Sequence, residues 1–169
     1  EGDSLKKLKA YSEEYYQGYL ELMIENMEVL LLRCNNCKHF FYSEIPNEKA
    51  ISSMYKIHAD RYNKKSKTKL IPQLKYKHKV LQSIARAFPD AKTFLDYGAG
   101  NCFWSEIASE YFEVTAFDEY ISRMIQSTNY SVENNFHNLL QKKFDIIFCN
   151  QVLEHLVDPN DAMKRFLDL

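Results

Sequence analysis

Residues 92–102 read Lys-Thr-Phe-Leu-Asp-Tyr-Gly-Ala-Gly-Asn-Cys, and this stretch decides the fold. A short apolar run at 93–95 ends in Asp96 and leads into a loop with Gly98 and Gly100, after which a helical pattern begins. The order strand, glycine turn, helix is how α/β proteins bring backbone close to a ligand, because a Cβ in the turn would block the approach or strain the chain. The stretch therefore predicts a ligand site at the carboxyl end of a buried strand.

A second apolar run, at 114–117, ends in Asp118, eighteen residues after Gly100. A carboxylate at this place can accept hydrogen bonds from two ribose hydroxyls. Glu119 and Tyr120 follow directly and are candidates to border an adenine ring. The glycine loop and the acid together predict a site for a nucleoside cofactor.

A third run, Phe-Asp-Ile-Ile-Phe-Cys-Asn at 144–150, is followed by Gln-Val-Leu-Glu-His-Leu-Val-Asp-Pro at 151–159. Residues 96–102 resemble the first motif, D-x-G-x-G-x-G, of class I S-adenosylmethionine-dependent methyltransferases, with Cys102 in place of the last glycine. Residues 144–159 resemble the fourth-strand motif of the same family. Three motifs in the right order are far more specific than one. Over residues 73–169 the resemblance implies an α/β fold with a Rossmann-like, doubly wound parallel sheet.

The resemblance also implies that the cofactor is S-adenosyl-L-methionine, and it assigns roles to individual residues. The methionine end would be held by Asp96 and the loop residues, the ribose by the acid after the second strand, and the adenine by the two residues that follow. Asn150 and Gln151 follow the fourth strand, at the edge where open α/β sheets bind ligands. The alternative interpretation of Asn150 is an ordinary turn residue at the end of a strand. The cofactor-binding candidates are Asp96, Gly98, Ala99, Gly100, Asn101, Asp118, Glu119, Tyr120, Asn150 and Gln151.

His155 is the candidate catalytic residue, because an imidazole has a pKa near neutrality and could take a proton from an acceptor hydroxyl. The competing interpretation is that His155 only hydrogen-bonds its own loop. Methyl transfer requires little from the protein beyond alignment of the acceptor with the methyl group, since the sulfonium already activates that group.

The cofactor domain at 73–169 is preceded by an expected N-terminal module at 1–55 and a basic linker at 56–72. In the module, the apolar run 29–32 and the aromatic run 40–42 flank Cys34-Asn-Asn-Cys37, which predicts a hairpin. Zinc needs four ligands, and Cys34 and Cys37 supply two. The hairpin is similar to the N-terminal zinc-binding region of some methyltransferases of sugars and related small molecules, which implies zinc in the full-length protein. The alternative is a turn with two free thiols.

Composition excludes several classes of function. The net charge of −1 gives no electrostatic reason to expect a nucleic-acid or membrane partner. No apolar stretch reaches the length of a transmembrane helix, and no signal peptide is visible. The four cysteines do not suggest a disulfide framework, so we expect a reduced, cytoplasmic setting. Oligomeric state stays open.

The basic stretch 56–79 is interpreted first as a solvated linker and helix face, and second as a patch that attracts a phosphate-bearing acceptor.

We therefore expect S-adenosylmethionine-dependent methyl transfer to a small-molecule acceptor. The resemblance of the N-terminal hairpin implies a sugar or sugar nucleotide as the first choice, and the resemblance of residues 151–159 implies a quinone or lipid precursor as the second. A Rossmann oxidoreductase is one alternative, although Phe103 stands where a dinucleotide fingerprint has its third glycine. A non-catalytic zinc or interaction module with a degenerate cofactor fold is the other. Only the first four of the family's seven strands, ordered 3-2-1-4-5-7-6, can be recognised. We therefore expect a fragment in which strand 144–150 forms an exposed edge.

Overall fold

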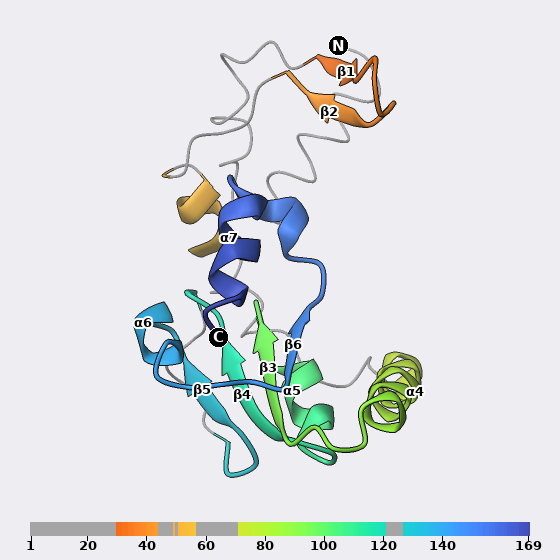
Figure 1. Ribbon diagram of the computed structural model, residues 1–169, viewed down its shortest axis with the longest axis vertical. Helices are drawn as coiled ribbons and strands as arrows, with labels where there is room; N and C mark the ends of the chain where they lie inside the picture. The colour runs from red at the N-terminus through yellow and green to blue at the C-terminus, as the bar shows by residue number, and fades with distance from the viewer. Residues whose placement is uncertain (1–29, 44–48, 50, 57–70, 121–126) are drawn as a thin grey trace. The chain divides into compact units, whose positions relative to one another are not determined.

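The computed structural model describes residues 30–43, 49, 51–56, 71–120 and 127–169 (Figure 1). The chain divides into two compact units, residues 1–61 and 62–169, and each is described by itself. The boundary falls inside the segment 56–72 that we expect to be a linker. Ile121, Met124 and Ile125 stand at helical spacing, and the helix that this spacing predicts lies outside the described residues, as does most of that linker.

The first unit contains the predicted hairpin. Strands β1 (Leu31–Arg33) and β2 (Phe40–Tyr42) pair antiparallel. The turn between them is closed by two backbone hydrogen bonds, from Lys38 N to Cys34 O at 3.0 Å and from Cys34 N to His39 O at 2.8 Å. The sequence predicts a short helix from Pro46 to about Tyr55, and among the described residues there, 51–56 are helical.

The second unit is built on a four-stranded parallel sheet. Its strands are β3 (Thr93–Tyr97), β4 (Glu113–Phe117), β5 (Ser131–Glu133) and β6 (Ile146–Cys149). They lie in the order β5-β4-β3-β6, and every neighbouring pair is parallel. This order confirms the Rossmann-like sheet predicted from the sequence and matches the first four strands of the expected topology. Within the described part of the chain, β6 pairs only with β3.

Helices pack on the sheet because successive strand residues point to opposite faces. Phe94 of β3 lies in one core with side chains of α4 (Ile71–Ala87) and α5 (Phe103–Ala108). The next residue, Leu95, lies in a second core with side chains of α6 (Phe136–Leu139) and α7 (Pro159–Phe166). Apolar side chains on both faces are what a buried parallel sheet requires, and they confirm the doubly wound arrangement.

The register of β6 on β3 is set at their amino ends by Asp145. Its Oδ2 accepts hydrogen bonds from the backbone N–H groups of Lys92 and Thr93, at 2.8 and 2.9 Å, and from the Thr93 hydroxyl at 3.0 Å. These bonds to the ionised carboxylate hold the pKa of Asp145 below its usual range. In this register Asp96 of β3 lies opposite Phe148 of β6 and Ala116 of β4.

Candidate functional site

The loop after β3 is bonded to the end of β4. The backbone N–H groups of Gly98 and Ala99 both donate to the carbonyl of Phe117, at 2.7 and 2.9 Å. Gly98 has a φ of 77°, and a Cβ on it would lie 2.3 Å from Cγ2 of Val152. Glycine is required here because both the backbone conformation and the packing of the segment after β6 exclude a side chain.

Gly100 is constrained differently. It also has a positive φ, 54°, yet a Cβ on it would meet nothing within 4 Å. Its N–H donates to Oδ2 of Asp118 at 3.0 Å, while Oδ1 of Asp118 accepts from the N–H of Tyr120 at 2.8 Å. The loop thus borders open space beside a carboxylate that two backbone amides orient. Each carboxylate oxygen keeps a second lone pair for a ligand hydroxyl.

Asp96 lies beneath the loop and is 2% exposed. Its Oδ2 accepts a hydrogen bond of 2.6 Å from the hydroxyl of Ser105, which joins β3 to α5. Burial raises the pKa of Asp96 to about 6, against the opposing effects of the Ser105 hydrogen bond and the Lys77 charge. Asp96 therefore supports the loop from below and can change its protonation state near neutral pH.

The residue that replaces the family's last glycine adopts a glycine-like conformation. Cys102 precedes α5 with φ 59° and ψ 23°, in the left-handed region. Its side chain is buried, and burial raises the pKa of the thiol to about 12, so the thiol stays neutral. Asn101 accepts a hydrogen bond from the N–H of Phe103 at 3.3 Å. The cysteine thus keeps the shape of the loop and makes it less mobile than a glycine would.

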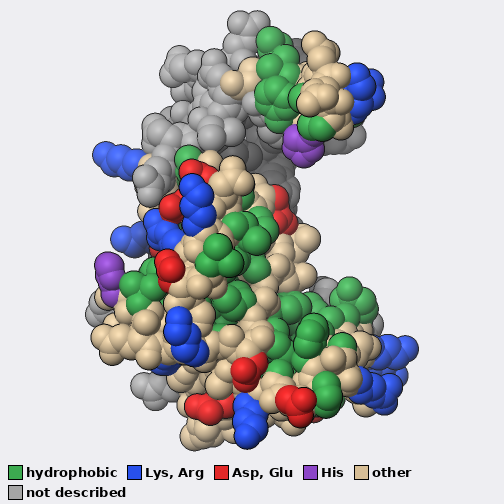
Figure 2. Space-filling view, in the orientation of Figure 1, with side chains coloured by type: hydrophobic (Ala, Val, Ile, Leu, Met, Phe, Trp, Pro, Cys, Tyr) green, Lys and Arg blue, Asp and Glu red, His purple; other side chains and the backbone are tan. Residues whose placement is uncertain are grey.

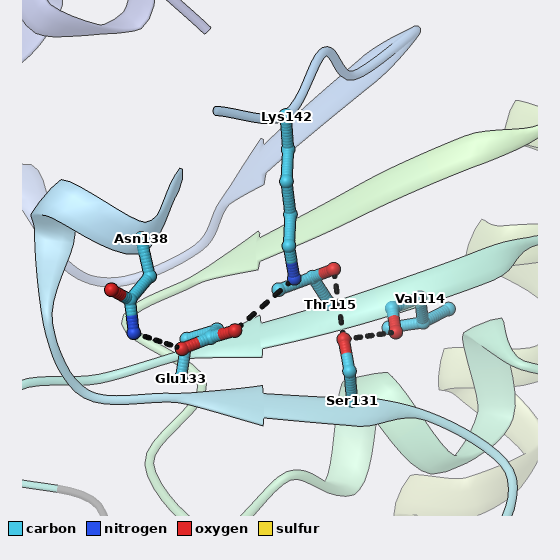
Figure 3. A network of polar contacts seen from close by, with 6 residues as sticks. All are labelled: Val114, Thr115, Ser131, Glu133, Asn138 and Lys142. Atoms are coloured by element: carbon cyan, nitrogen blue, oxygen red, sulfur yellow. Dashed lines mark hydrogen bonds and ion pairs between the residues drawn. The ribbon is translucent and has the colours of Figure 1, made fainter. Parts of the chain in front are cut away.

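A polar network surrounds the end of β5 (Figure 3). The two carboxylate oxygens of Glu133 accept hydrogen bonds from Asn138 at 2.8 Å and from Lys142 at 3.2 Å. The Glu133 carbonyl accepts from the N–H of Asp118 at 3.2 Å. Two residues before Glu133 along β5, the Ser131 hydroxyl donates to the hydroxyl of Thr115, its partner on β4, at 3.0 Å. These contacts fix the positions of the strand ends. No pattern in the sequence predicts that Glu133 has this role.

The end of β6 carries the remaining candidates. Asn150 and Gln151 are exposed, and Gln151 has a φ of 57°, which a glutamine rarely adopts. The short 3₁₀ helix η2 (Leu153–His155) follows, with His155 Nε2 at 4.0 Å from Glu154 Oε1 and half of its side chain exposed. Asp158 then caps α7 by accepting from the N–H groups of Asn160 and Asp161, each at 3.0 Å. The Asp-Pro pair of the motif is thus a helix start.

Lys77 interacts with Trp104 and Asp96, and it was not identified as a candidate from the sequence. It stands on α4 between Leu74 and Leu81 on the helix face that packs on the sheet. Its Nζ lies 4.0 Å from the centroid of the Trp104 ring. Burial lowers the pKa of Lys77, and the charge of Asp96 opposes this shift. A lysine on an otherwise apolar helix face was the signal that could have identified it.

The cysteine pair does not extend into a metal centre within the described residues. Cys34 and Cys37 both lie in the turn between β1 and β2. Backbone N–H groups donate hydrogen bonds to the sulfur of Cys34, and these bonds lower the pKa of its thiol. In the described ranges no three His, Cys, Asp or Glu side chains come together as metal ligands. Two thiols alone do not support a zinc site. The described helices also include none that is long and apolar enough to cross a membrane.

The parallel strands bring the predicted cofactor residues to one edge, because the ends of β3, β4 and β6 lie side by side. The family model described as a methyltransferase domain matches residues 72–169, more than half of the chain. No curated protein and no solved structure matches the chain. The parallel sheet, the glycine loop bonded to Asp118 and the family match agree, and the chain belongs to the methyltransferase domain family, of class I.

Proposed function

We propose that this protein binds S-adenosylmethionine at the carboxyl edge of β3 and β4 and transfers its methyl group to a small-molecule acceptor. The observation that carries the proposal is the arrangement of Gly100. Its backbone borders open space, and its N–H is bonded to the Asp118 carboxylate. A ligand can therefore approach the backbone closely at the point where an acceptor for ribose hydroxyls is already oriented.

The residues present fit this cofactor. Asp118 would accept hydrogen bonds from the ribose, and the loop 98–101 would lie along the amino-acid end. Glu119 and Tyr120 would border the adenine, and Asn150 and Gln151 would close the side of the site next to β6. A pyrophosphate-containing dinucleotide fits less well, since Phe103 occupies the position of the third glycine of its fingerprint.

When bound, S-adenosylmethionine supplies a methyl group already activated on a sulfonium, so the chain's task is to hold the acceptor in line with it. His155 is the candidate base for an acceptor hydroxyl. Its imidazole is half exposed, three residues after Val152, which covers Gly98. In this role it would accept a proton as the new bond to the methyl carbon forms.

A sugar or sugar nucleotide is the acceptor class that we propose first. The support is the hairpin with Cys34 and Cys37, which is similar to a segment of some methyltransferases of sugars. A quinone or lipid precursor is the competing class. Activity assays with acceptors of both classes separate the two. Methyl transfer only to an isoprenoid or quinone-type acceptor would overturn the sugar proposal and leave the cofactor proposal intact.

Calorimetry with S-adenosylhomocysteine tests the cofactor proposal directly. We expect one site per chain, with NAD showing no binding at the same concentrations. His155→Ala should then lower kcat without changing the affinity for S-adenosylhomocysteine, while a structural role would change neither. Binding of NAD and not of S-adenosylhomocysteine would instead support the oxidoreductase alternative.

A further inference from the structure

Lys77 differs from the other cations of α4 in its position on the helix. Exposed cations of α4 include Lys75, Lys79 and Arg86, and Figure 2 shows Lys and Arg side chains gathered over this helix. Lys77, in contrast, lies between Leu74 and Leu81 on the apolar face and is partly buried. Placing an ammonium there costs solvation free energy, which a ligand of opposite charge would offset.

The ammonium of Lys77 rests on aromatic rings and not on a carboxylate. Its Nζ lies 4.0 Å from the centroid of Trp104 and 6.0 Å from that of Phe103. No carboxylate of the described residues lies within ion-pair distance of it. A cation–π contact orients the ammonium but leaves its N–H donors available for an acceptor.

Trp104 and Phe103 form the first turn of α5, directly after the glycine loop. The Trp104 ring packs on Phe148 of β6, with centroids 4.9 Å apart. Lys77 is thereby placed on the β6 side of β3, whereas Asp118 follows β4 on the other side. A ligand whose ribose meets Asp118 and which crosses the loop 98–101 would present its opposite end towards Lys77.

We propose that the Lys77 ammonium binds the carboxylate of the amino-acid end of S-adenosylmethionine. The inference rests on the proposed function, which supplies the ligand. That ligand carries a single anionic group, the carboxylate, at the end farthest from the adenine. Lys77 has no carboxylate partner among the residues that the structure describes, and it lies at the corresponding end of the site, where it complements this group. Trp104 holds the ammonium by a contact that leaves its N–H donors free for the ligand.

The test compares two ligands that differ only in this group, S-adenosylhomocysteine and its decarboxylated form, by calorimetry on the whole protein. Lys77→Met keeps the length of the apolar stem and its contact with Trp104. We expect it to weaken binding of S-adenosylhomocysteine by at least about tenfold. Its affinity for the decarboxylated ligand should stay within about twofold of the wild type, which also shows that the site is folded.

Lys75→Met is the matched control, since it removes the same charge from an exposed position of the same helix. It should leave both affinities unchanged. Lys77→Gln serves as a second variant and should show the same selective loss as Lys77→Met. An equal loss for both ligands, or no loss for either, would overturn the role of Lys77 while the wild-type protein still binds. Failure of the wild-type protein to bind either ligand would overturn the proposed cofactor and this inference together.

Discussion

The backbone N–H of Gly100 donates a hydrogen bond of 3.0 Å to Oδ2 of Asp118. This bond connects the loop after β3 to the residue that directly follows β4, and it is present before any ligand is bound. The second oxygen of Asp118 is held by the N–H of Tyr120 at 2.8 Å. Two parts of the candidate cofactor site are therefore preorganised relative to each other, which lowers the entropy that binding would have to offset.

Asp118→Ala should weaken binding of S-adenosylhomocysteine by at least about tenfold, because charge-assisted hydrogen bonds are worth about 1.5–3 kcal/mol. The variant also releases the amides of Gly100 and Tyr120, so some loss of order in the loop is expected. Calorimetry gives the dissociation constant, and circular dichroism shows whether the fold is retained. Glu113→Ala, at the opposite end of β4, is the control and should bind normally. An unchanged dissociation constant for Asp118→Ala would remove the residue from the site.

Gly98→Ala and Gly100→Ala should fail in different ways. At Gly98 the added methyl meets Val152 at 2.3 Å, so the free energy of unfolding should fall by more than the about 1–2 kcal/mol of backbone strain alone. At Gly100 the methyl enters open space, so only the backbone cost applies. We expect Gly100→Ala to remain folded and to bind S-adenosylhomocysteine more weakly. Thermal unfolding and calorimetry on both variants check this, and equal stability of the two would contradict the packing at Val152.

Asp96→Asn should change how stability depends on pH. The folded-state pKa of Asp96 is raised to about 6 from an unfolded value of 3.8, so the folded protein binds a proton more tightly than the unfolded chain does. The stabilisation from this proton is complete below the unfolded pKa and is lost as pH rises through the folded pKa. Between the unfolded and the folded pKa, the free energy of unfolding of the wild type should therefore fall relative to that of Asp96→Asn by about 1.4 kcal/mol for each pH unit.

Chemical unfolding of both proteins between pH 4 and pH 7 measures the effect, since this range of about three pH units starts just above the unfolded pKa of 3.8 and extends past the folded pKa of about 6. Asp90→Asn, an exposed carboxylate, is the control and should track the wild type across the range. A constant difference between Asp96→Asn and the wild type would mean that Asp96 titrates at its ordinary pKa.

Asp145→Asn should destabilise the sheet at neutral pH, because its carboxylate accepts from two backbone N–H groups and the hydroxyl at the start of β3. The pKa of Asp145 is lowered by these bonds, so their contribution is present above the unfolded pKa and is lost as pH falls through the folded pKa. The melting temperatures of wild type and variant should differ at neutral pH and converge below about pH 4. A difference that persists in acid would assign the effect to packing.

Much of the site could be read from the sequence because its parts are local. Strand β3, the loop with Gly98 and Gly100, and the acid after β4 each follow from short patterns, and the strand order follows from their resemblance to one family. The hairpin β1–β2 was predicted as well, from two apolar runs around a turn. Local backbone preferences and alternating apolar runs suffice for such features.

Other features depend on residues that are distant in the sequence. Lys92 and Asp145 are 53 positions apart in the sequence, so no local pattern predicts the hydrogen bond between them. The same holds for the packing of Val152 against Gly98. Lys77 is anomalous in the sequence, as a lysine on an apolar face, yet its neighbours Trp104 and Asp96 come from other elements.

The sequence by itself determined the fold class, the order of the strands and the edge of the sheet that carries the proposed cofactor residues. Only the tertiary structure decided that Asp118 is bonded to Gly100, that Asp96 is buried with a raised pKa, and that Lys77 lies on Trp104. The physical reason is that hydrogen bonds, desolvation and cation–π contacts depend on distances in space. Separation along the chain does not set those distances once helices and strands have packed.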